Sequence, residues 1–121
     1  MAVSFIEHEG RQILFIDFAN LQDETAILAV VAEAREFVEQ LPMRKEQLVL
    51  VDMVRLRYSN AILDSFRGLV EHNSPWVFAS AVYGLVGMGN VAFRAVNLMS
   101  GSRMRGFERR EEALEWLSAQ K

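Results

Sequence analysis

The chain has 121 residues, of which 51% are hydrophobic and 24% charged, with only 2 Pro and 7 Gly. This composition excludes a disordered tail, a collagen-like fibre and a low-complexity linker, and the length suits one domain with a sizeable core. The absence of Cys excludes disulfide frameworks, zinc–cysteine sites, iron–sulfur clusters and thiol nucleophiles. We therefore expect a single globular domain spanning residues 1–121.

Two short segments rich in Val, Ile and Phe open the chain, Val3–His8 and Gln12–Phe18. Gly10 lies between them and can adopt the positive φ that a tight turn requires. The pattern predicts a β-hairpin.

A helix is predicted next, from a start with Asn20 as its N-cap and Asp23 three residues later. Apolar residues then recur at three- and four-residue spacing, which is the pattern of an amphipathic helix. They are Ile27, Val30, Val31, Ala34, Phe37, Val38 and Leu41. Pro42 is expected to stop this helix.

The middle of the chain alternates strands and helices. Gln47–Met53 and Trp76–Tyr83 are apolar on both faces, as strands of a parallel sheet buried between helices are. Between them, Ser59 is a natural N-cap for a helix that ends before Pro75. The apolar stripe of that helix is Ile62, Leu63, Phe66, Leu69 and Val70.

A glycine-rich turn follows the second of these strands. We expect a helix over Asn90–Met99, a short strand over Met104–Phe107 and a closing helix over Arg109–Ala119. The whole order is β-β-α-β-α-β-α-β-α. This order predicts an α/β domain with a mostly parallel five-stranded sheet, an N-terminal hairpin and four flanking helices.

Charge is unevenly distributed along the chain. The net charge of −3 divides into −6 over residues 1–42, +5 over residues 43–110 and −2 over residues 111–121. This asymmetry can steer an acidic partner or a second copy of the chain, but it is too weak for a nucleic-acid binder. The apolar runs are far shorter than the roughly 20 residues of a membrane span, and the N-terminus lacks signal-peptide features. A cytoplasmic location is expected.

Three runs in the second half carry a family pattern. They are AVYGLVGM at residues 81–88, NLMSG at residues 97–101 and FERREEALEWL at residues 107–117. They resemble the bacterial SpoIIAA-like group of the STAS superfamily, whose members typically close with a phenylalanine-containing strand and an E-E-A-L-x-W-L helix. The element order of the chain agrees with that group, and Asp52 lies where its members carry an aspartate-terminated central strand. The resemblance implies relatives that act as phosphorylatable antagonists of anti-sigma factors, or as modules likened to the CRAL-TRIO lipid-binding fold.

Polar residues at the carboxyl ends of the predicted strands are the first candidate binding site. Asp17 and Asp52 end two parallel strands, at the edge where α/β sheets bind ligands. The functional interpretation joins them with Tyr58, Ser59 and the loop from Gly84 to Asn90 in a shared cleft. The alternative, which we favour, is that both aspartates accept hydrogen bonds from the turns that follow them.

The family resemblance also implies a role for Ser59, because STAS antagonists carry a phosphorylatable serine at the start of this helix, in the context D-S-S-G. A phosphate at that position would be stabilised by the helix N-terminus. The local sequence Tyr58-Ser59-Asn60-Ala61 lacks the aspartate and the glycine of the motif. N-capping alone explains Ser59, so we favour it over phosphorylation, and the departure counts against partner switching.

Two further features of the second half suggest anion binding. Gly84, Gly87 and Gly89 precede a helix and could cradle a phosphate, but their spacing matches neither the dinucleotide nor the P-loop pattern. A tight strand-to-helix connection is the better interpretation. Five arginines of the second half form either a binding site for an anion or an acidic partner, or a solvated face. A third alternative is that they contact the glutamates of the first helix in a second copy of the chain. The arginines are Arg94, Arg103, Arg105, Arg109 and Arg110.

Nothing in the sequence indicates catalysis. His8 and His72 are far apart and lack metal-ligand spacing, so no metal and no cofactor is expected. The leading hypothesis is a non-enzymatic STAS-like interaction or regulatory module that is a homodimer or binds another protein. The alternative is a domain that binds a lipid or another small apolar ligand beneath the predicted helix Asn90–Met99, because Met and aromatic residues gather there. A mean hydropathy of +0.10 also suggests that part of the surface is covered by another molecule.

Overall fold

The computed structural model describes residues 2–85 and 103–120. Within them, five strands form one sheet in the order β1-β2-β3-β4-β5. The strands are β1 (Val3–His8), β2 (Arg11–Asp17), β3 (Gln47–Asp52), β4 (Val77–Tyr83) and β5 (Arg103–Phe107). Strands β1 and β2 pair antiparallel, and every other pair is parallel. The predicted hairpin and the mostly parallel sheet are therefore confirmed.

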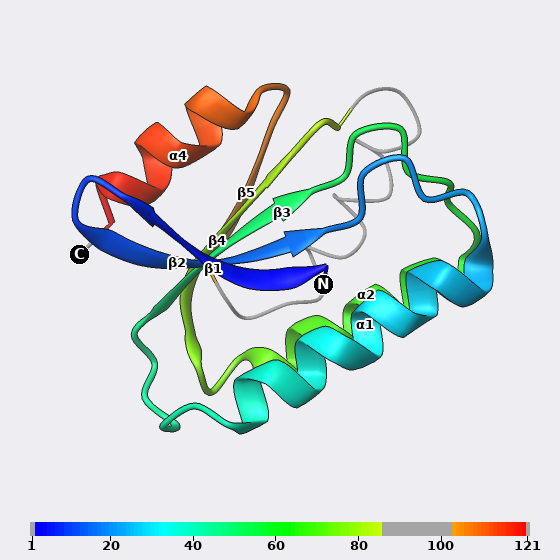
Figure 1. The fold of residues 1–121 in the computed structure, drawn as a ribbon, viewed down its shortest axis with the longest axis horizontal. Helices are drawn as coiled ribbons and strands as arrows, with labels where there is room; N and C mark the ends of the chain where they lie inside the picture. Colours follow the sequence, from blue (N-terminus) through cyan, green and yellow to red (C-terminus); the bar gives the residue numbers. More distant parts are fainter. Residues whose placement is uncertain (1, 86–102, 121) are drawn as a thin grey trace.

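Helices lie on both faces of this sheet (Figure 1). The helices α1 (Glu24–Glu39) and α2 (Asn60–Asn73) run side by side on one face, and α4 (Arg110–Ser118) lies on the other. A shared face for α1 and α2 follows from the chain geometry, since successive parallel strands are connected by crossovers of the same hand. The sheet is thus the middle layer of three.

The prediction of four helices is confirmed only in part. The described residues contain three helices, and their element order is β-β-α-β-α-β-β-α. The predicted helix Asn90–Met99 lies outside the described residues. Among the helices of the described ranges, none is long and apolar enough to cross a membrane.

The first helix begins three residues later than the sequence predicts. Asp23 is its N-cap and accepts a hydrogen bond from the Ala26 N–H at 3.3 Å. Asn20 instead has a φ of 64°, a left-handed conformation that asparagine tolerates better than most residues. The choice of Asn20 as the cap was therefore wrong, because its side chain serves a turn that precedes the helix. Ser59, in contrast, caps α2 as predicted and accepts from the Ile62 N–H at 3.2 Å.

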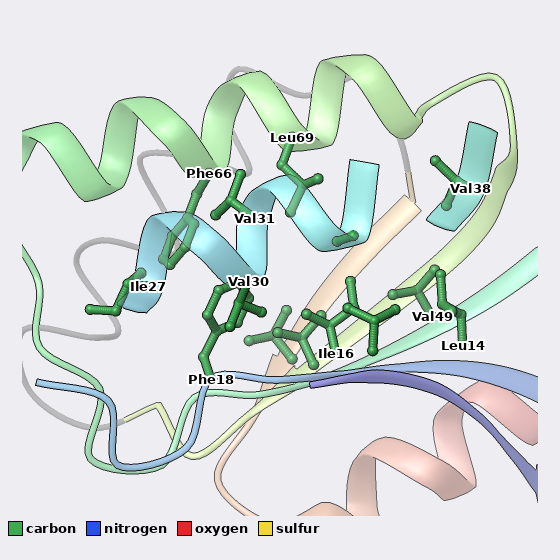
Figure 2. Packing of buried hydrophobic residues seen from close by; sticks show 14 of the residues in the cluster. Leu14, Ile16, Phe18, Ile27, Val30, Val31, Val38, Val49, Phe66 and Leu69 are labelled. Atoms are coloured by element: carbon green, nitrogen blue, oxygen red, sulfur yellow. The ribbon is translucent and has the colours of Figure 1, made fainter. Parts of the chain in front are cut away.

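Apolar side chains fill both spaces between the layers. The larger core lies between the sheet and the helices α1 and α2, where the Phe18 and Phe66 rings meet with centroids 5.0 Å apart (Figure 2). The smaller core lies between the sheet and α4 and includes Leu50 and Leu117, both fully buried. Because strands alternate the direction of their side chains, each central strand supplies both cores.

Arg11 holds the C-terminal end of α4. Its Nη1 donates to the carbonyl oxygens of Leu117 at 3.5 Å, Ser118 at 3.4 Å and Gln120. These contacts satisfy carbonyls that a helix end leaves without intrahelical partners, and they place a cation at the negative end of the helix dipole. They also join the first hairpin to the last helix.

Replacing Arg11 by glutamine is expected to lower the free energy of unfolding by about 1 kcal/mol, because these carbonyls lose a charged donor. Urea unfolding of the variant and the wild type measures the difference. Arg44→Gln is the matched control, since the exposed Arg44 makes only backbone hydrogen bonds among the described residues. Equal stability of the two variants would contradict the prediction.

Candidate functional site

The carboxyl ends of the three central strands meet at one edge of the sheet. In the strand register, Asp17 of β2 is the partner of Asp52 of β3, and Asp52 is the partner of Tyr83 of β4. This is the edge at which parallel α/β sheets place their ligand sites. The structure therefore brings the two aspartates next to each other, as the sequence predicts.

The loop between β2 and α1 begins with a tight turn that is held by Asp17, the last residue of β2. The Asp17 Oδ1 atom accepts from the Ala19 N–H at 2.9 Å. Asn20 follows with its positive φ, and the Leu21 N–H then donates to the Phe18 carbonyl at 3.3 Å. Asp17 thus serves as the turn acceptor that we favoured from the sequence.

The loop between β3 and α2 repeats this turn residue for residue. The Asp52 Oδ1 atom accepts from the Val54 N–H at 3.0 Å. Arg55 has a φ of 55°, and the Leu56 N–H donates to the Met53 carbonyl at 3.3 Å. Two consecutive loops at the carboxyl edge therefore have the same local hydrogen bonds.

The two loops are bonded to each other by main-chain and side-chain groups. The Arg55 Nε donates to Asn20 Oδ1 at 2.6 Å, and Gln22 Nε2 donates to the Arg55 carbonyl at 2.6 Å. The Arg57 N–H donates to the Leu21 carbonyl at 3.0 Å, and its Nη1 donates to the Gln22 carbonyl at 3.4 Å. The edge is therefore one connected polar surface in which the loop positions are mutually fixed.

Gly84 packs directly against the second of these loops. It has a φ of +84°, and a Cβ atom at this position would lie 2.5 Å from Val54 Cγ2 and 2.7 Å from the Val54 nitrogen. Only glycine fits both the backbone conformation and this close approach. The structural interpretation of Gly84 as a tight connection is therefore supported, while Gly87, Gly89, Asn90 and Arg94 lie outside the described residues.

Asp52 also takes part in a charged network on the α4 face of the sheet. The Tyr83 hydroxyl donates to Asp52 Oδ2 at 2.8 Å and accepts from Arg110 Nη1 at 3.0 Å. The Arg110 guanidinium lies over the Phe15 ring, 5.0 Å from its centroid. Burial raises the pKa of the Tyr83 phenol to about 12, with opposing contributions from Arg110, which lowers the pKa, and Asp52, which raises it. The phenol is thus a neutral bridge between a cation and a carboxylate.

Stability is expected to fall as the pH rises from about 10 to about 12, because the unfolded chain releases the Tyr83 proton in this window while the folded chain retains it. Below pH 10 the contribution is fully present. We expect a loss of about 1 kcal/mol from this group after allowance for solvent screening. Burial raises the pKa of Tyr58 too, so Tyr83→Phe isolates the effect. Urea unfolding near pH 10 and near pH 12 should show a smaller loss in the free energy of unfolding for the variant than for the wild type. Equal losses in the two proteins would refute the assignment of this effect to Tyr83.

A small apolar cavity lies on the opposite face of the sheet, beneath α2. Its volume is about 80 Å³, several times the roughly 10–15 Å³ that one water needs. The lining is mostly aliphatic and aromatic, with Tyr58, Asn73, Ser74 and Ser80 as its more polar members. Tyr58 therefore lines this cavity, whereas the Asp52 carboxylate faces α4. In the described part of the chain the two side chains thus lie on opposite faces of the sheet, and residues 86–90 of the predicted cleft lie outside that part.

The arrangement of these elements matches solved structures. A structure of an uncharacterized protein of the DUF3478 family with a SpoIIAA-like fold, from Shewanella loihica PV-4, is similar with a TM-score of 0.73 and 16% sequence identity, over 96% of this chain and 92% of that chain. The chain has a SpoIIAA-like STAS fold. An anti-sigma-factor antagonist (STAS) domain protein from Planctomyces limnophilus is similar with a TM-score of 0.66 and 10% identity, over 97% of this chain and 98% of that chain. No family model and no curated protein matches the sequence.

Within this STAS fold, Ser59 is already engaged by two neighbours. Besides capping α2, its hydroxyl donates to Glu24 Oε1 at 3.2 Å. A phosphoryl group on this oxygen would place negative charge beside the Glu24 carboxylate, which opposes the stabilisation offered by the helix N-terminus. The geometry agrees with the N-cap interpretation.

Within residues 103–120, the arginines of the second half do not gather at one point of the STAS fold. Arg103 donates to Gln120 beyond the C-terminal end of α4 and lies over the Phe78 ring, whereas Arg110 is at the helix N-terminus. Arg109 pairs with Glu112 at 3.5 Å. Their contacts are thus spread along α4.

The sequence contained a signal for the paired turns that we did not use. The segments DFANL at residues 17–21 and DMVRL at residues 52–56 share an aspartate, an apolar residue and a leucine in the same positions. Each follows a predicted strand and precedes a predicted helix. This repeat would have identified Asn20 and Arg55 as equivalent turn residues, and it would have drawn attention to Arg55 and Arg57 as side chains of the edge.

Proposed function

We propose that this chain is a single-domain, non-enzymatic regulatory module of the cytoplasm that binds a protein through the carboxyl edge of its sheet. The observation that carries the proposal is the bonded pair of equivalent loops at that edge. A surface fixed before binding loses little conformational entropy on association, which favours recognition. The partner is another protein or a second copy of the chain.

The contacts of the Asp17, Asp52 and Ser59 side chains support binding over chemistry. The Asp17 and Asp52 carboxylates accept hydrogen bonds within their turns, and Asp52 also binds Tyr83. The Ser59 hydroxyl is shared between the α2 N-terminus and Glu24. Among the described residues, no hydrogen bond joins a serine hydroxyl to a histidine, the pairing that activates a serine nucleophile. The similarity to an anti-sigma-factor antagonist domain is consistent with a partner-binding role.

Blocking the edge tests the proposal. Asn60→Trp places a bulky side chain on an exposed residue at the start of α2, and Gln40→Trp places the same side chain on an exposed residue at the far end of α1. Light scattering after size exclusion reports self-association, and affinity capture from cells that produce the protein reports other partners. We expect Asn60→Trp to abolish the dimer or the captured protein and Gln40→Trp to retain it. A strict monomer at high micromolar concentration would remove the self-association, and capture unaffected by Asn60→Trp would refute the edge.

The cavity beneath α2 favours a second candidate function, the binding of a small apolar ligand. Its mostly apolar lining with a few polar groups is typical of small-molecule sites. Native mass spectrometry of protein isolated from cells should show an additional bound mass, and Leu63→Trp, which fills the cavity, should eliminate it. Repeated spectra of the unliganded mass alone would argue against this candidate.

A further inference from the structure

The carboxyl edge contains an unfavourable backbone conformation at an exposed arginine. Asn20 and Arg55 occupy the same position of the same turn, with φ values of 64° and 55°. Asparagine adopts this left-handed conformation readily, whereas a longer side chain such as arginine adopts it at a cost in free energy. The turn itself is therefore better served by asparagine at both positions. The turn therefore does not explain an arginine at position 55, and its guanidinium group is the feature that asparagine would lack. Backbone strain retained at a surface residue is a feature of functional sites.

Among the described residues, the Arg55 side chain is held in place through one nitrogen. Its Nε donates to Asn20 Oδ1, which leaves the two terminal nitrogens of the guanidinium for another acceptor. Arg57 is anchored in the same way, with Nη1 on the Gln22 carbonyl. Both guanidinium groups are thus anchored to the loop that carries Asn20 and Gln22.

Neither guanidinium is neutralised by a carboxylate of the described residues. The ion pairs found there join Arg67 to Asp64, His72 to Glu39 and Arg109 to Glu112. The acidic residues that follow Gln22 in the chain already accept hydrogen bonds, since Asp23 caps α1 and Glu24 accepts from the Ser59 hydroxyl. The arginines therefore remain available to an anionic group from outside.

We propose that Arg55 and Arg57 form a clamp for two carboxylates of an acidic protein segment. Arginine binds carboxylates through paired N–H groups, and each guanidinium here is fixed at a separate point of the neighbouring loop. Because both anchor points lie on the same short loop, we expect two acidic side chains close together in a chain to reach both guanidinium groups. The inference rests on the proposed protein-binding function and names the chemistry of the partner. The segment belongs to another protein or to the acidic residues 1–42 of a second copy, whose net charge is −6.

An NMR titration tests the clamp without a known partner. The probe is an acetylated, amidated peptide of alternating Glu and Gly, and the control peptide has Gln in place of Glu. At low salt, the Glu peptide should shift the backbone amides of Asn20, Gln22, Arg55 and Arg57 in a saturable way. The shifts should vanish in about 0.5 M salt, because exposed charges are then screened. Concentration-dependent shifts of the same amides without peptide identify a second copy as the source of the segment.

Arg55→Asn separates binding from a structural role. We expect the variant to bind the Glu peptide at least about fivefold more weakly, while its melting temperature stays within about 2 °C of the wild type, because relief of the backbone strain offsets the lost Arg55–Asn20 hydrogen bond. A purely structural arginine would leave the affinity for the peptide unchanged. Arg44→Gln, on an exposed loop at the other end of the sheet, should leave peptide affinity unchanged.

Three results would overturn the clamp: no saturable shift, an equal response to the Gln peptide, or unchanged binding by Arg55→Asn. If Asn60→Trp still abolishes partner binding in that case, the edge binds protein by other contacts and the proposed function stands. If Asn60→Trp has no effect while the Glu peptide binds as expected, the clamp is present but the proposed interaction surface is wrong.

Discussion

Gly84→Ala is expected to lower the free energy of unfolding by about 3 kcal/mol or more, because two costs coincide at this residue. The φ of +84° is unfavourable for any residue with a Cβ atom. The new Cβ atom would also lie 2.5–2.8 Å from three atoms of Val54, two of them in the backbone. The main chain must move to relieve this contact, which would displace the loop that begins at Asp52.

Gly10→Ala is the matched control for this prediction. Gly10 has a similar φ of +77°, but a Cβ atom there would meet nothing within 4 Å. The control should therefore lose only the conformational cost, about 1 kcal/mol. Urea unfolding of both variants separates the two costs, and equal losses would show that the contact with Val54 is relieved without strain. The Val54 amide signal should also shift in Gly84→Ala and stay unchanged in Gly10→Ala.

Asp52→Ala is expected to cost about 2–3 kcal/mol, the second largest effect. One oxygen of this carboxylate holds the Val54 N–H, and the other accepts from the Tyr83 hydroxyl. Removing both leaves a buried hydroxyl and the nearby Arg110 without their anionic partner. The loss therefore affects the β3–α2 loop and the attachment of α4 together.

Asp17→Ala provides the comparison for Asp52→Ala, since Asp17 holds only the equivalent turn through the Ala19 N–H. We expect it to cost about 1 kcal/mol. Chemical denaturation of Asp17→Ala, Asp52→Ala, Tyr83→Phe and the double variant Asp52→Ala with Tyr83→Phe measures the excess. The double variant should be less destabilised than the sum of its parts, because the two residues share one hydrogen bond. Similar losses for Asp17→Ala and Asp52→Ala would show that the network with Tyr83 adds nothing.

Much of the fold follows from local pattern. The hydrophobic spacing of Ile27–Val38 predicts α1, and continuous apolar runs predict β3 and β4 as buried parallel strands, all of which the structure confirms. The start of α1 is where local reasoning fails. Asn20 and Asp23 are both good N-cap residues, but the turn held by Asp17 puts Asn20 in the left-handed position, where its side chain accepts from Arg55, 35 residues away.

The candidate site is likewise predictable where its contacts are local in sequence. Asp17, Asp52 and Ser59 bond to groups two or three residues along the chain, so sequence indicates their roles. The bridge from Asp52 through Tyr83 to Arg110 joins three elements, and no spacing reveals it. The separation of Asp52 from Tyr58 has a related cause. Their side chains lie on opposite faces of the sheet, which their shared position near one edge does not reveal.

The repeated turn also bears on how this surface can change over evolution. Its shape is set by the aspartate at the strand end and by backbone hydrogen bonds, so the side chain at the left-handed position does not determine the loop path. Positions 20 and 55 are therefore two sites at which residues of different charge can be exchanged on a constant scaffold. We expect substitutions at this pair to change the charge of the surface with small effects on stability and none on the loop path.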